Sequence, residues 1–537
     1  MKTVPLKGIL FVSFFFSFFV MLFGLSRYSM IGLFVFSFLV FFVTGVALHV
    51  LFNRVFSPQM KRRLSGCSLG VKLYNSCSDR KLMMILWFLI SLSFLPAFLA
   101  LFPGTFGYDA PIQAAQYFGE MELTSANPLL HTCLLGLFLS LGESILKNAS
   151  LGLALFTLIQ GLLVTQVLAR SLLFLKKLHT PFTVIAGGFL WIVLNPTLHI
   201  LTFNVTKDIL FGVCFLHFFI NLLETICSTD TIKPNFPTGR FCFTHPCLRL
   251  LISGSIMCLM RNAAIYLAVL LAVILIFFLR QFRETIFSLC MIFLISRLLS
   301  LFFAQGLHIP TGNARENMSI PIQQLAAVCS ASVCNTEPAN ITTQQLDTVQ
   351  EILPVESWDT FQQDTADPMK AFFDTEAFSK DSEKYISLYL TVGSQNPGIY
   401  IRAFRNLVLS YLDMGRSVRR GLALEETFPG ISHLTISRYG LFPKYYSFLE
   451  KQLQKKNYFP PMQPGISIYL IVIGTGVSIE RKSKKMLLCI LPAALYFCGL
   501  LLGPIALLRY LFPMMLTTPL LFGILFWKEA APTTTNA

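Results

Sequence analysis

The chain has 537 residues, of which 54% are hydrophobic and 13% are charged, and its net charge is +15. This composition, with 53 phenylalanines and a mean hydropathy of +0.65, excludes an ordinary soluble domain and is typical of a protein that crosses a membrane several times. The basic residues lie at the ends of apolar runs, so we expect membrane lipid and no nucleic acid as a partner.

Apolar runs long enough to cross a membrane as helices recur along the chain. Such a helix needs about 20 apolar residues, because the hydrocarbon layer is about 30 Å thick. We predict spans at 8–25, 31–52, 82–102, 151–175, 181–203, 209–226, 248–279, 285–304, 464–479, 486–508 and 510–527, with a shorter segment at 129–146. The predicted fold class is therefore an all-α polytopic membrane protein with about 11–13 transmembrane helices.

Basic residues predict how these spans are oriented. Segment 53–81 contains seven of them against the single acid Asp79, namely Arg54, Lys61, Arg62, Arg63, Lys72, Arg80 and Lys81. Because cytoplasmic loops are enriched in Lys and Arg, this segment and the N-terminus are predicted to be cytoplasmic in a cell membrane. Residues 82–146 contain no Lys or Arg. Loop 103–131 is therefore predicted to be extracytoplasmic. Two full crossings by 129–146 and 151–175 would place Lys176 and Lys177 outside, so the short segment 129–146, which contains Glu143, is predicted to dip into the membrane or lie at its surface.

The chain is predicted to have three parts. Residues 1–304 form an N-terminal transmembrane bundle that includes the external loop 103–131, and residues 464–537 form C-terminal transmembrane helices. The polar stretch 305–463 between them is predicted to be an extracytoplasmic, mainly helical insert, large enough for a core of its own.

Within the insert, turn and cap residues predict where helices begin. The expected starts are Asp381-Ser382, Asn396-Pro397 and Pro443, because a capping side chain or a first-turn proline precedes an apolar periodicity at each. Cys329 and Cys334 also fall in the insert, and they can form a disulfide if the compartment oxidises thiols.

Asp109 is the residue of loop 103–131 best placed for chemistry. It lies between Gly107-Tyr108 and Pro111, where the backbone turns as the chain leaves the membrane. A carboxylate there can accept a proton from an incoming hydroxyl or hold a divalent cation, whereas the alternative is an N-cap for a helix that begins at Pro111. His131 also has two interpretations: a ligand for metal or phosphate, or an interfacial histidine with satisfied hydrogen bonds.

Charged residues also interrupt or border the apolar runs. A charge in mid-span costs about 2.5 to 3.5 kcal/mol on insertion scales, so those that remain usually face a cavity, a partner or a substrate. Arg261 divides the run 248–279, Lys207 and Asp208 open the run 209–226, and Arg509 lies between two runs. These residues predict a cationic pocket for a phosphate. The alternative is that each arginine reaches the lipid headgroups or pairs with a buried acid.

Seven sequence blocks follow one another in an order that resembles a known class. They are PGTFGYDAPIQ (103–113), NPLLHT (127–132), TKDILF (206–211), RNAAIY (261–266), NMSIPIQQLA (317–326), NPGIYIRAF (396–404) and GPIALLRYLFP (503–513). The order is similar to that of the GT-C class of integral-membrane glycosyltransferases. It resembles more closely a poorly characterised family of bacterial polytopic proteins that is usually linked to that class.

This resemblance implies a GT-C-like bundle that transfers a sugar from a polyprenyl-phosphate donor to a glycan, lipid or protein acceptor on the extracytoplasmic face. Asp109 would activate the acceptor or help hold a metal, and Asp208 would be the second catalytic acid. The substrate-binding residues would be Lys207, Arg261 and Arg509 for the lipid phosphate, with Gln113 and Gln323 from the first and fifth blocks. The resemblance does not identify a cofactor. A divalent cation is one option, and its candidate ligands are Asp109, Asp208 and His131. Asn127 and Leu129 stand where the related pattern often has a His or a second Pro, which leaves the metal question open.

Two other functions fit the same residues. A transporter or flippase of a lipid-linked or anionic solute would share the buried arginines, although we see no paired halves with matching broken helices. A non-catalytic protein that binds lipid-linked glycans would keep the same cationic pocket. The enzyme hypothesis requires that Asp109, Asp208, Lys207, Arg261 and Arg509 gather at one site.

Overall fold

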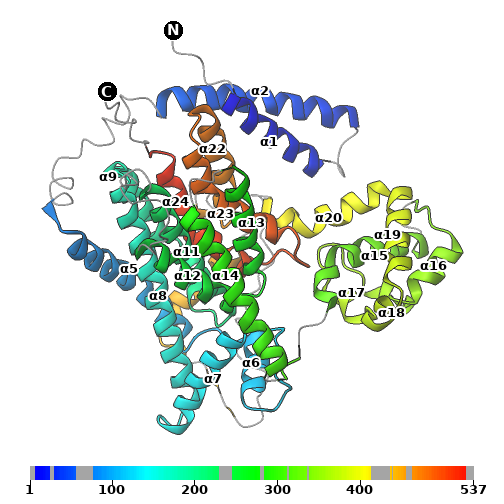
Figure 1. Cartoon of the computed structure of the whole chain (residues 1–537), viewed down its shortest axis with the longest axis horizontal. Coiled ribbons are helices and arrows are strands. Elements are labelled where there is room, and N and C mark those ends of the chain that lie inside the picture. Colours follow the sequence, from blue (N-terminus) through cyan, green and yellow to red (C-terminus); the bar gives the residue numbers. More distant parts are fainter. Residues whose placement is uncertain are drawn as a thin grey trace.

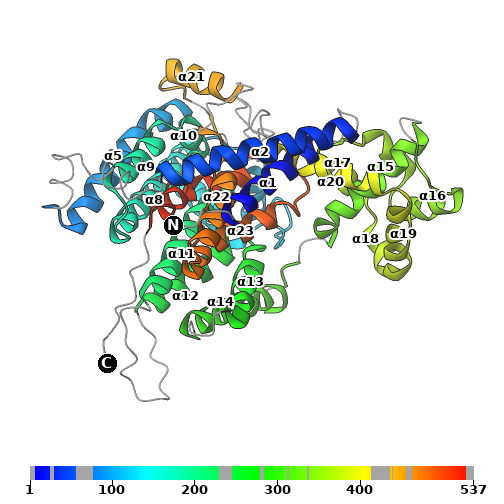
Figure 2. The ribbon, with the colours of Figure 1, turned by 90° about the horizontal axis from the view of Figure 1, so that it is seen from above.

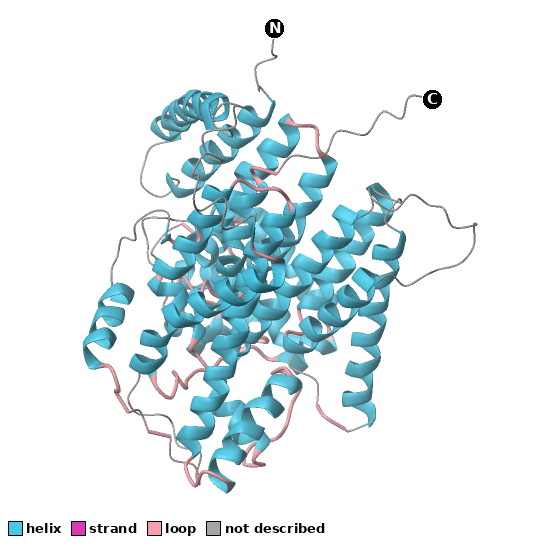
Figure 3. Cartoon of the chain, turned by 90° about the vertical axis from the view of Figure 1, so that its left-hand side faces the viewer, coloured by secondary structure: helices cyan, strands magenta, loops and turns pink. Residues whose placement is uncertain are grey.

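The computed structural model describes residues 7–24, 30–55, 76–228, 245–278, 283–306, 308–310, 314–334, 338–412, 434, 436–437, 439–454 and 462–527. Within these residues the regular elements are helices, and β structure is limited to isolated bridges (Figures 1 and 3). The predicted all-α fold is therefore confirmed. Most of the basic loop, residues 56–75, and the basic residues Lys233, Arg240 and Arg280 lie outside the described residues.

Apolar helices form the larger body of the molecule. They are α1 (Lys7–Gly24), α2 (Met30–Val55), α5 (Asp79–Leu101), α7 (Leu129–Ser144), α8 (Ala149–Lys177), α9 (Phe182–Leu194), α10 (Pro196–Thr202), α11 (Lys207–Ser228), α12 (His245–Met260), α13 (Ala264–Phe278), α14 (Arg283–Leu301), α22 (Ile466–Glu480), α23 (Lys484–Leu500) and α24 (Phe512–Ile524). Among the described residues, α5, α8, α11 and α14 with its π-helical extension η2 (Phe302–Gly306) are long and apolar enough to cross a membrane. The bent pair α9–α10 is a fifth candidate. The protein is thus of the multi-pass membrane type, and the number of complete crossings stays a prediction.

Two predicted runs are interrupted, one of them at the arginine that divides it in the sequence. The run 248–279 is divided into α12 and α13, which meet at Arg261. The run 181–203 bends by 60° at Asn195, whose side chain accepts a hydrogen bond from the backbone N–H of Leu198 and caps α10.

The predicted run 486–508 is wrong at its C-terminal end, because α23 stops at Leu500. Gly503 and Pro504 follow, and proline cannot continue a helix. The non-helical residues form contacts with the insert instead: the Pro504 carbonyl accepts a hydrogen bond from the N–H of Ala366, and Ile505 forms a β-bridge with Thr365.

α5 and α8 lie antiparallel, and their polar ends define two ends of the bundle. The Lys176 ammonium lies 3.0 Å from the Asp79 carboxylate at one end. At the other end, the Thr157 hydroxyl donates a hydrogen bond to the Pro103 carbonyl. α7 packs against the first turns of α8, where the backbones of Gly142 and Gly152 approach closely. Lys176 therefore lies at the same end as Asp79, as the charge pattern requires, and α7 with the first turns of α8 forms a hairpin beside the opposite end.

The insert contains a second group of helices (Figure 1). They are η3 (Ala314–Met318), α15 (Ser319–Val333), α16 (Thr343–Gln350), η4 (Val355–Thr360), α17 (Asp367–Phe372), α18 (Thr375–Lys380), α19 (Ser382–Gln395) and α20 (Pro397–Leu412). Helices α15 to α19 surround their own apolar core, which includes Trp358 and Met369, and α20 leads back toward the bundle. The predicted starts at Ser382 and Pro397 are confirmed, and the Asp381 side chain accepts from the N–H of Lys384 as a cap.

α21 (Pro443–Gln454) also begins where predicted, but it packs on α5 and α10 of the bundle, away from α15 to α19 (Figure 2). The disulfide that the sequence allows between Cys329 and Cys334 is not formed in the structure, where both are free thiols. Cys329 is buried in the insert core and Cys334 is exposed beyond the end of the same helix, α15.

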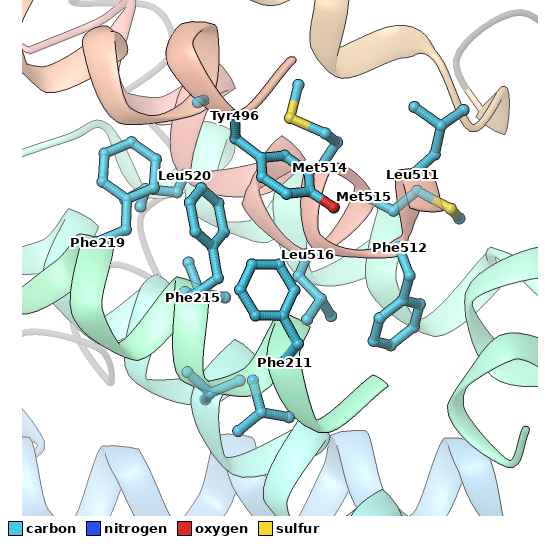
Figure 4. Close-up of a cluster of buried hydrophobic side chains, with 14 of the residues drawn as sticks. Phe211, Phe215, Phe219, Tyr496, Leu511, Phe512, Met514, Met515, Leu516 and Leu520 are labelled. Atoms are coloured by element: carbon cyan, nitrogen blue, oxygen red, sulfur yellow. The ribbon is translucent and has the colours of Figure 1, made fainter. Parts of the chain in front are cut away.

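A cluster of aromatic side chains lies at the centre of the bundle (Figure 4). Phe211, Phe215 and Phe219 recur every four residues on one face of α11 and are completely buried. The Tyr496 ring of α23 packs against this face, with its centre 5.0 Å from that of Phe215. This packing places the Tyr496 hydroxyl beside the N-terminal end of α11, where the candidate site begins.

Candidate functional site

Two loops that are distant in sequence are joined at the site end of the bundle. The segment after α5 and the segment before α11 form a parallel β-bridge between Thr105 and Asn204. The Thr105 N–H donates to the Phe203 carbonyl, and the Val205 N–H donates to the Thr105 carbonyl. The bridge fixes the start of α6 (Asp109–Tyr117) close to the start of α11 at Lys207.

Asp109 forms ion pairs with two cations in this position. Its Oδ2 atom lies 3.1 Å from Lys207 Nζ and 3.3 Å from Arg509 Nη1, and 26% of its side chain is exposed. Burial by itself raises the pKa of Asp109, but Lys207 and Arg509 together outweigh burial and hold this pKa below its ordinary value. The N-cap alternative is wrong, because Asp109 is the first residue of α6 and its side chain caps no helix.

Asp208 forms the second half of the cluster and is completely buried. Its Oδ1 atom lies 3.0 Å from Arg261 Nη1, and its Oδ2 atom lies 3.7 Å from Arg509 Nε. Arg509 therefore bridges the two acids, and the order of contacts is Lys207, Asp109, Arg509, Asp208, Arg261. Three cations face two carboxylates, which leaves one net positive charge for an anion.

Aromatic rings surround the two guanidinium groups. The carbon at the centre of the Arg509 guanidinium lies 4.7 Å from the centre of the Tyr108 ring, and that of Arg261 lies 5.2 Å from the Tyr510 ring. The Tyr496 hydroxyl accepts a hydrogen bond from Arg261 and donates one to the Tyr510 carbonyl. Tyr496 and Tyr510 are not among the residues predicted from the sequence, although Tyr510 follows Arg509 directly and Tyr496 lies within an apolar run.

Tyr108 has a backbone φ of 58°, an uncommon conformation for a residue with a large side chain. The surrounding structure must stabilise such a conformation, and it often does so at functional sites. Here it places the Tyr108 ring over Arg509 immediately before Asp109.

The acidic loop after α6 also contacts Lys207 and the residue that follows Arg261. Asn127 Oδ1 accepts a hydrogen bond of 2.8 Å from Lys207 Nζ, and the Ser125 carbonyl accepts one of 2.9 Å from the Asn262 side chain. Asn127 therefore orients Lys207 toward Asp109, a role that the sequence did not indicate.

Gln113 and His131 lie behind Asp109 and are both completely buried. The Gln113 side chain donates to the Thr132 hydroxyl, and its Oε1 atom lies 3.0 Å from His131 Nδ1. His131 Nε2 is buried without a hydrogen-bond partner. The interpretation of His131 as a satisfied histidine therefore holds for one ring nitrogen only. Gln113 joins α6 to the first turn of α7.

Gln323 lies on α15 of the insert, where its amide donates to the Gln362 carbonyl. In the part of the chain that the structure describes, no hydrogen bond or ion pair joins Gln323 to the five charged residues. It lies instead near Thr365 and Ile505, whose bridge supports the segment before Arg509.

The metal candidates do not form a binding site in this arrangement. Over the described ranges, no three His, Cys, Asp or Glu side chains are grouped so that they could hold a metal ion. Asp109 and Asp208 face Lys and Arg side chains, and His131 faces Gln113. A metal at these carboxylates would have to displace their cations, so the residues present do not fit one.

Comparison with known sequences assigns the chain to a family. Residues 119–418 match the model of a family of unknown function, DUF6020, and this match covers more than half of the chain. It includes Lys207, Asp208 and Arg261 but begins after Asp109 and ends before Arg509. No curated protein and no solved structure matches the chain. The chain therefore belongs to the DUF6020 family and is a helical, multi-pass protein of membrane type.

Proposed function

We propose that this protein transfers a sugar from a polyprenyl-phosphate donor to an acceptor hydroxyl on the extracytoplasmic side of the membrane. The observation that supports the proposal most is the bridging of Asp109 and Asp208 by Arg509, with Lys207 and Arg261 at the two ends of the cluster. The site combines a partly exposed carboxylate with cations at the end of long apolar helices. An anionic, lipid-linked donor requires both features.

In the proposed reaction the acceptor oxygen attacks the anomeric carbon of the donor sugar. The bond between this carbon and the phosphate oxygen breaks, and the hydroxyl proton passes to the Asp109 carboxylate. The leaving polyprenyl phosphate is already anionic, so Lys207 and Arg509 stabilise its charge and need not donate a proton. Asp208 is buried and holds Arg261 and Arg509 in place, which makes it a positioning residue in this scheme.

In this scheme, the ion pairs of Asp109 make donor binding precede proton transfer. Before a donor binds, Lys207 and Arg509 keep the pKa of Asp109 low, which makes it a weak base. A donor phosphate that binds these two cations removes part of that stabilisation. Asp109 then becomes a better proton acceptor when the leaving group is already in place.

The orientation of the site is part of the proposal. The basic end of the bundle, with Lys176 beside Asp79, is assigned to the cytoplasm by the positive-inside rule, so the Asp109 end faces outward. In a background without native cysteines, Glu120→Cys should react with a membrane-impermeant thiol reagent in intact cells, whereas Lys484→Cys should react only after the cells are opened. The reverse pattern would contradict the assignment.

The transfer reaction can be tested with the purified full chain in lipid nanodiscs. A panel of polyprenyl-phosphate hexoses, pentoses and amino sugars is incubated with mixed acceptors, and the release of polyprenyl phosphate is measured. Asp109→Asn should abolish release, whereas Asp347→Asn, a change at an exposed acid on α16, should leave it unchanged. Near-normal turnover by Asp109→Asn would exclude the catalytic role. Donor binding without release across the whole panel would favour a transporter or a non-catalytic binder.

A further inference from the structure

A second charged cluster lies at the opposite end of the bundle from Asp109. Glu224, near the end of α11, faces three cations from two other helices: Arg170 at 3.4 Å and Lys177 at 3.8 Å from α8, and Arg249 at 3.3 Å from α12. The Glu224 side chain is 14% exposed, so this cluster is partly enclosed where the three helices meet.

Hydrogen bonds give the junction a defined geometry. Arg170 Nη2 donates to Asn221 Oδ1 at 2.6 Å, and Asn221 Nδ2 donates to the Ser253 hydroxyl and to the Arg249 carbonyl. Asn221 is buried, so one amide side chain connects α8, α11 and α12 within the bundle. Arg170 is thereby fixed without using all of its donors.

The position of the cluster corresponds to the headgroup layer of a membrane. Glu224 follows Lys207 by 17 residues on the continuous helix α11, which at 1.5 Å per residue is about 26 Å along the axis. The hydrocarbon core of a bilayer is about 30 Å thick, so the two charged ends of α11 are separated by about one membrane thickness. Between these charged ends, α11 carries the buried phenylalanines of the aromatic cluster (Figure 4).

The charges of the junction are not balanced. Among the residues that the structure describes here, three cations surround one carboxylate, which leaves an excess of two positive charges. The side chains of Lys177 and Arg249 are 52% and 54% exposed, so their remaining N–H donors are accessible from outside the protein. Glu224 orients these two side chains, and a phosphate group beside them would neutralise the excess charge.

We propose that Arg170, Lys177 and Arg249 form a binding site for the phosphate of an anionic phospholipid headgroup on the face of the membrane opposite Asp109. A basic pocket between transmembrane helices at the headgroup level is suited to this ligand. The site is separate from the proposed sugar transfer and does not depend on it. The competing explanation is a general attraction of basic helix ends to an anionic surface, with no defined site.

The experiment uses the purified full chain in a neutral detergent, titrated with phosphatidylglycerol or with phosphatidylcholine of the same acyl chains. Bound lipid is counted by native mass spectrometry, and thermal stability is measured in parallel. The variant Lys177→Gln/Arg249→Gln removes the half-exposed cations and keeps the Arg170–Glu224 pair and the Asn221 bonds, so it should fold. Lys484→Gln, at an exposed lysine that begins α23, is the matched control.

We expect phosphatidylglycerol to bind at least tenfold more tightly than phosphatidylcholine to the unchanged protein and to Lys484→Gln, a difference of about 1.4 kcal/mol. The double variant should lose this preference. Equal binding of the two lipids, or an unchanged preference in the double variant, would overturn the proposal. A loss of equal size in Lys484→Gln would mean general surface attraction, and equal stabilisation by glycerol phosphate in solution would exclude a lipid site.

Discussion

Asp109 forms ion pairs with the cations that an anionic donor would need. Removing its charge is therefore predicted to increase the affinity for an anionic ligand. The Asp109 carboxylate lies between Lys207 and Arg509. A bound phosphate must compete with this carboxylate for the same N–H donors. Replacing Asp109 with Asn, which has nearly the same shape, removes the competing charge, so the variant should bind polyprenyl phosphate more tightly than the unchanged protein.

The magnitude follows from the two ion pairs of Asp109. They are 3.1 and 3.3 Å long, and the carboxylate is 26% exposed, so solvent weakens each pair relative to a fully buried one. Partly exposed pairs contribute at most about 1 kcal/mol each, so releasing both should favour anion binding by about 1 to 2 kcal/mol. This corresponds to roughly a 5- to 30-fold decrease in Kd.

The assay is equilibrium binding of a short-chain polyprenyl phosphate to the purified protein at fixed ionic strength, with Asp347→Asn as the matched acid-to-amide control. Asp109→Asn should bind more tightly and transfer no sugar, whereas Asp347→Asn should match the unchanged protein in both. Weaker or unchanged binding by Asp109→Asn would refute the competition. Binding is measured without any donor sugar, so this result can hold even if the protein proves not to be a transferase.

Three further predictions concern stability. Asp208→Asn should destabilise the protein by about 3 to 5 kcal/mol in thermal denaturation, because it removes the buried acid of Arg261 and leaves Arg509 with Asp109 alone. An unchanged melting temperature would contradict that account. The difference in melting temperature between Asp109→Asn and the unchanged protein should stay constant from about pH 8 to 5. Asp109 has a lowered pKa in the folded protein, so its charge stabilises the fold fully at any pH above its ordinary pKa of 3.8. This contribution is lost as the pH falls through the folded-state pKa. Gly152→Ala should cost about 1 to 3 kcal/mol, since its added carbon would overlap the Phe138 carbonyl between α7 and α8. Gly187→Ala on α9 meets open space and should stabilise the protein by up to about 1 kcal/mol, because Ala is the better helix former. Equal effects of the two changes would mean that helix propensity alone decides.

Residue types and spacing were sufficient to predict most helices of the bundle. Long apolar runs predict helices because a membrane leaves the backbone few other ways to satisfy its hydrogen bonds. The breaks at Arg261 and at Asn195 were also predictable, since a charge and a proline each disturb an apolar helix locally. The end of α23 was mispredicted because Leu501 and Leu502 extend the apolar run past the helix, and Gly503-Pro504 stops it only a few residues before Arg509.

The candidate site was predictable in its charged residues and not in their partners. Asp109, Asp208, Lys207, Arg261 and Arg509 stand out because charges are rare in apolar sequence. Their pairing depends on the β-bridge between Thr105 and Asn204 and on tertiary packing, neither of which has a periodicity in the sequence.

The structure connects the insert to the charged cluster through a short covalent path. The Ala366 N–H donates to the Pro504 carbonyl, and the Tyr411 hydroxyl donates to the Ile505 carbonyl. Arg509 follows Ile505 by only four residues and contacts both acids of the site. These contacts hold the segment that leads into η6 (Leu508–Leu511), the 3-10 helix that carries Arg509. We therefore expect a displacement of the insert to shift Arg509, which contacts both carboxylates of the site.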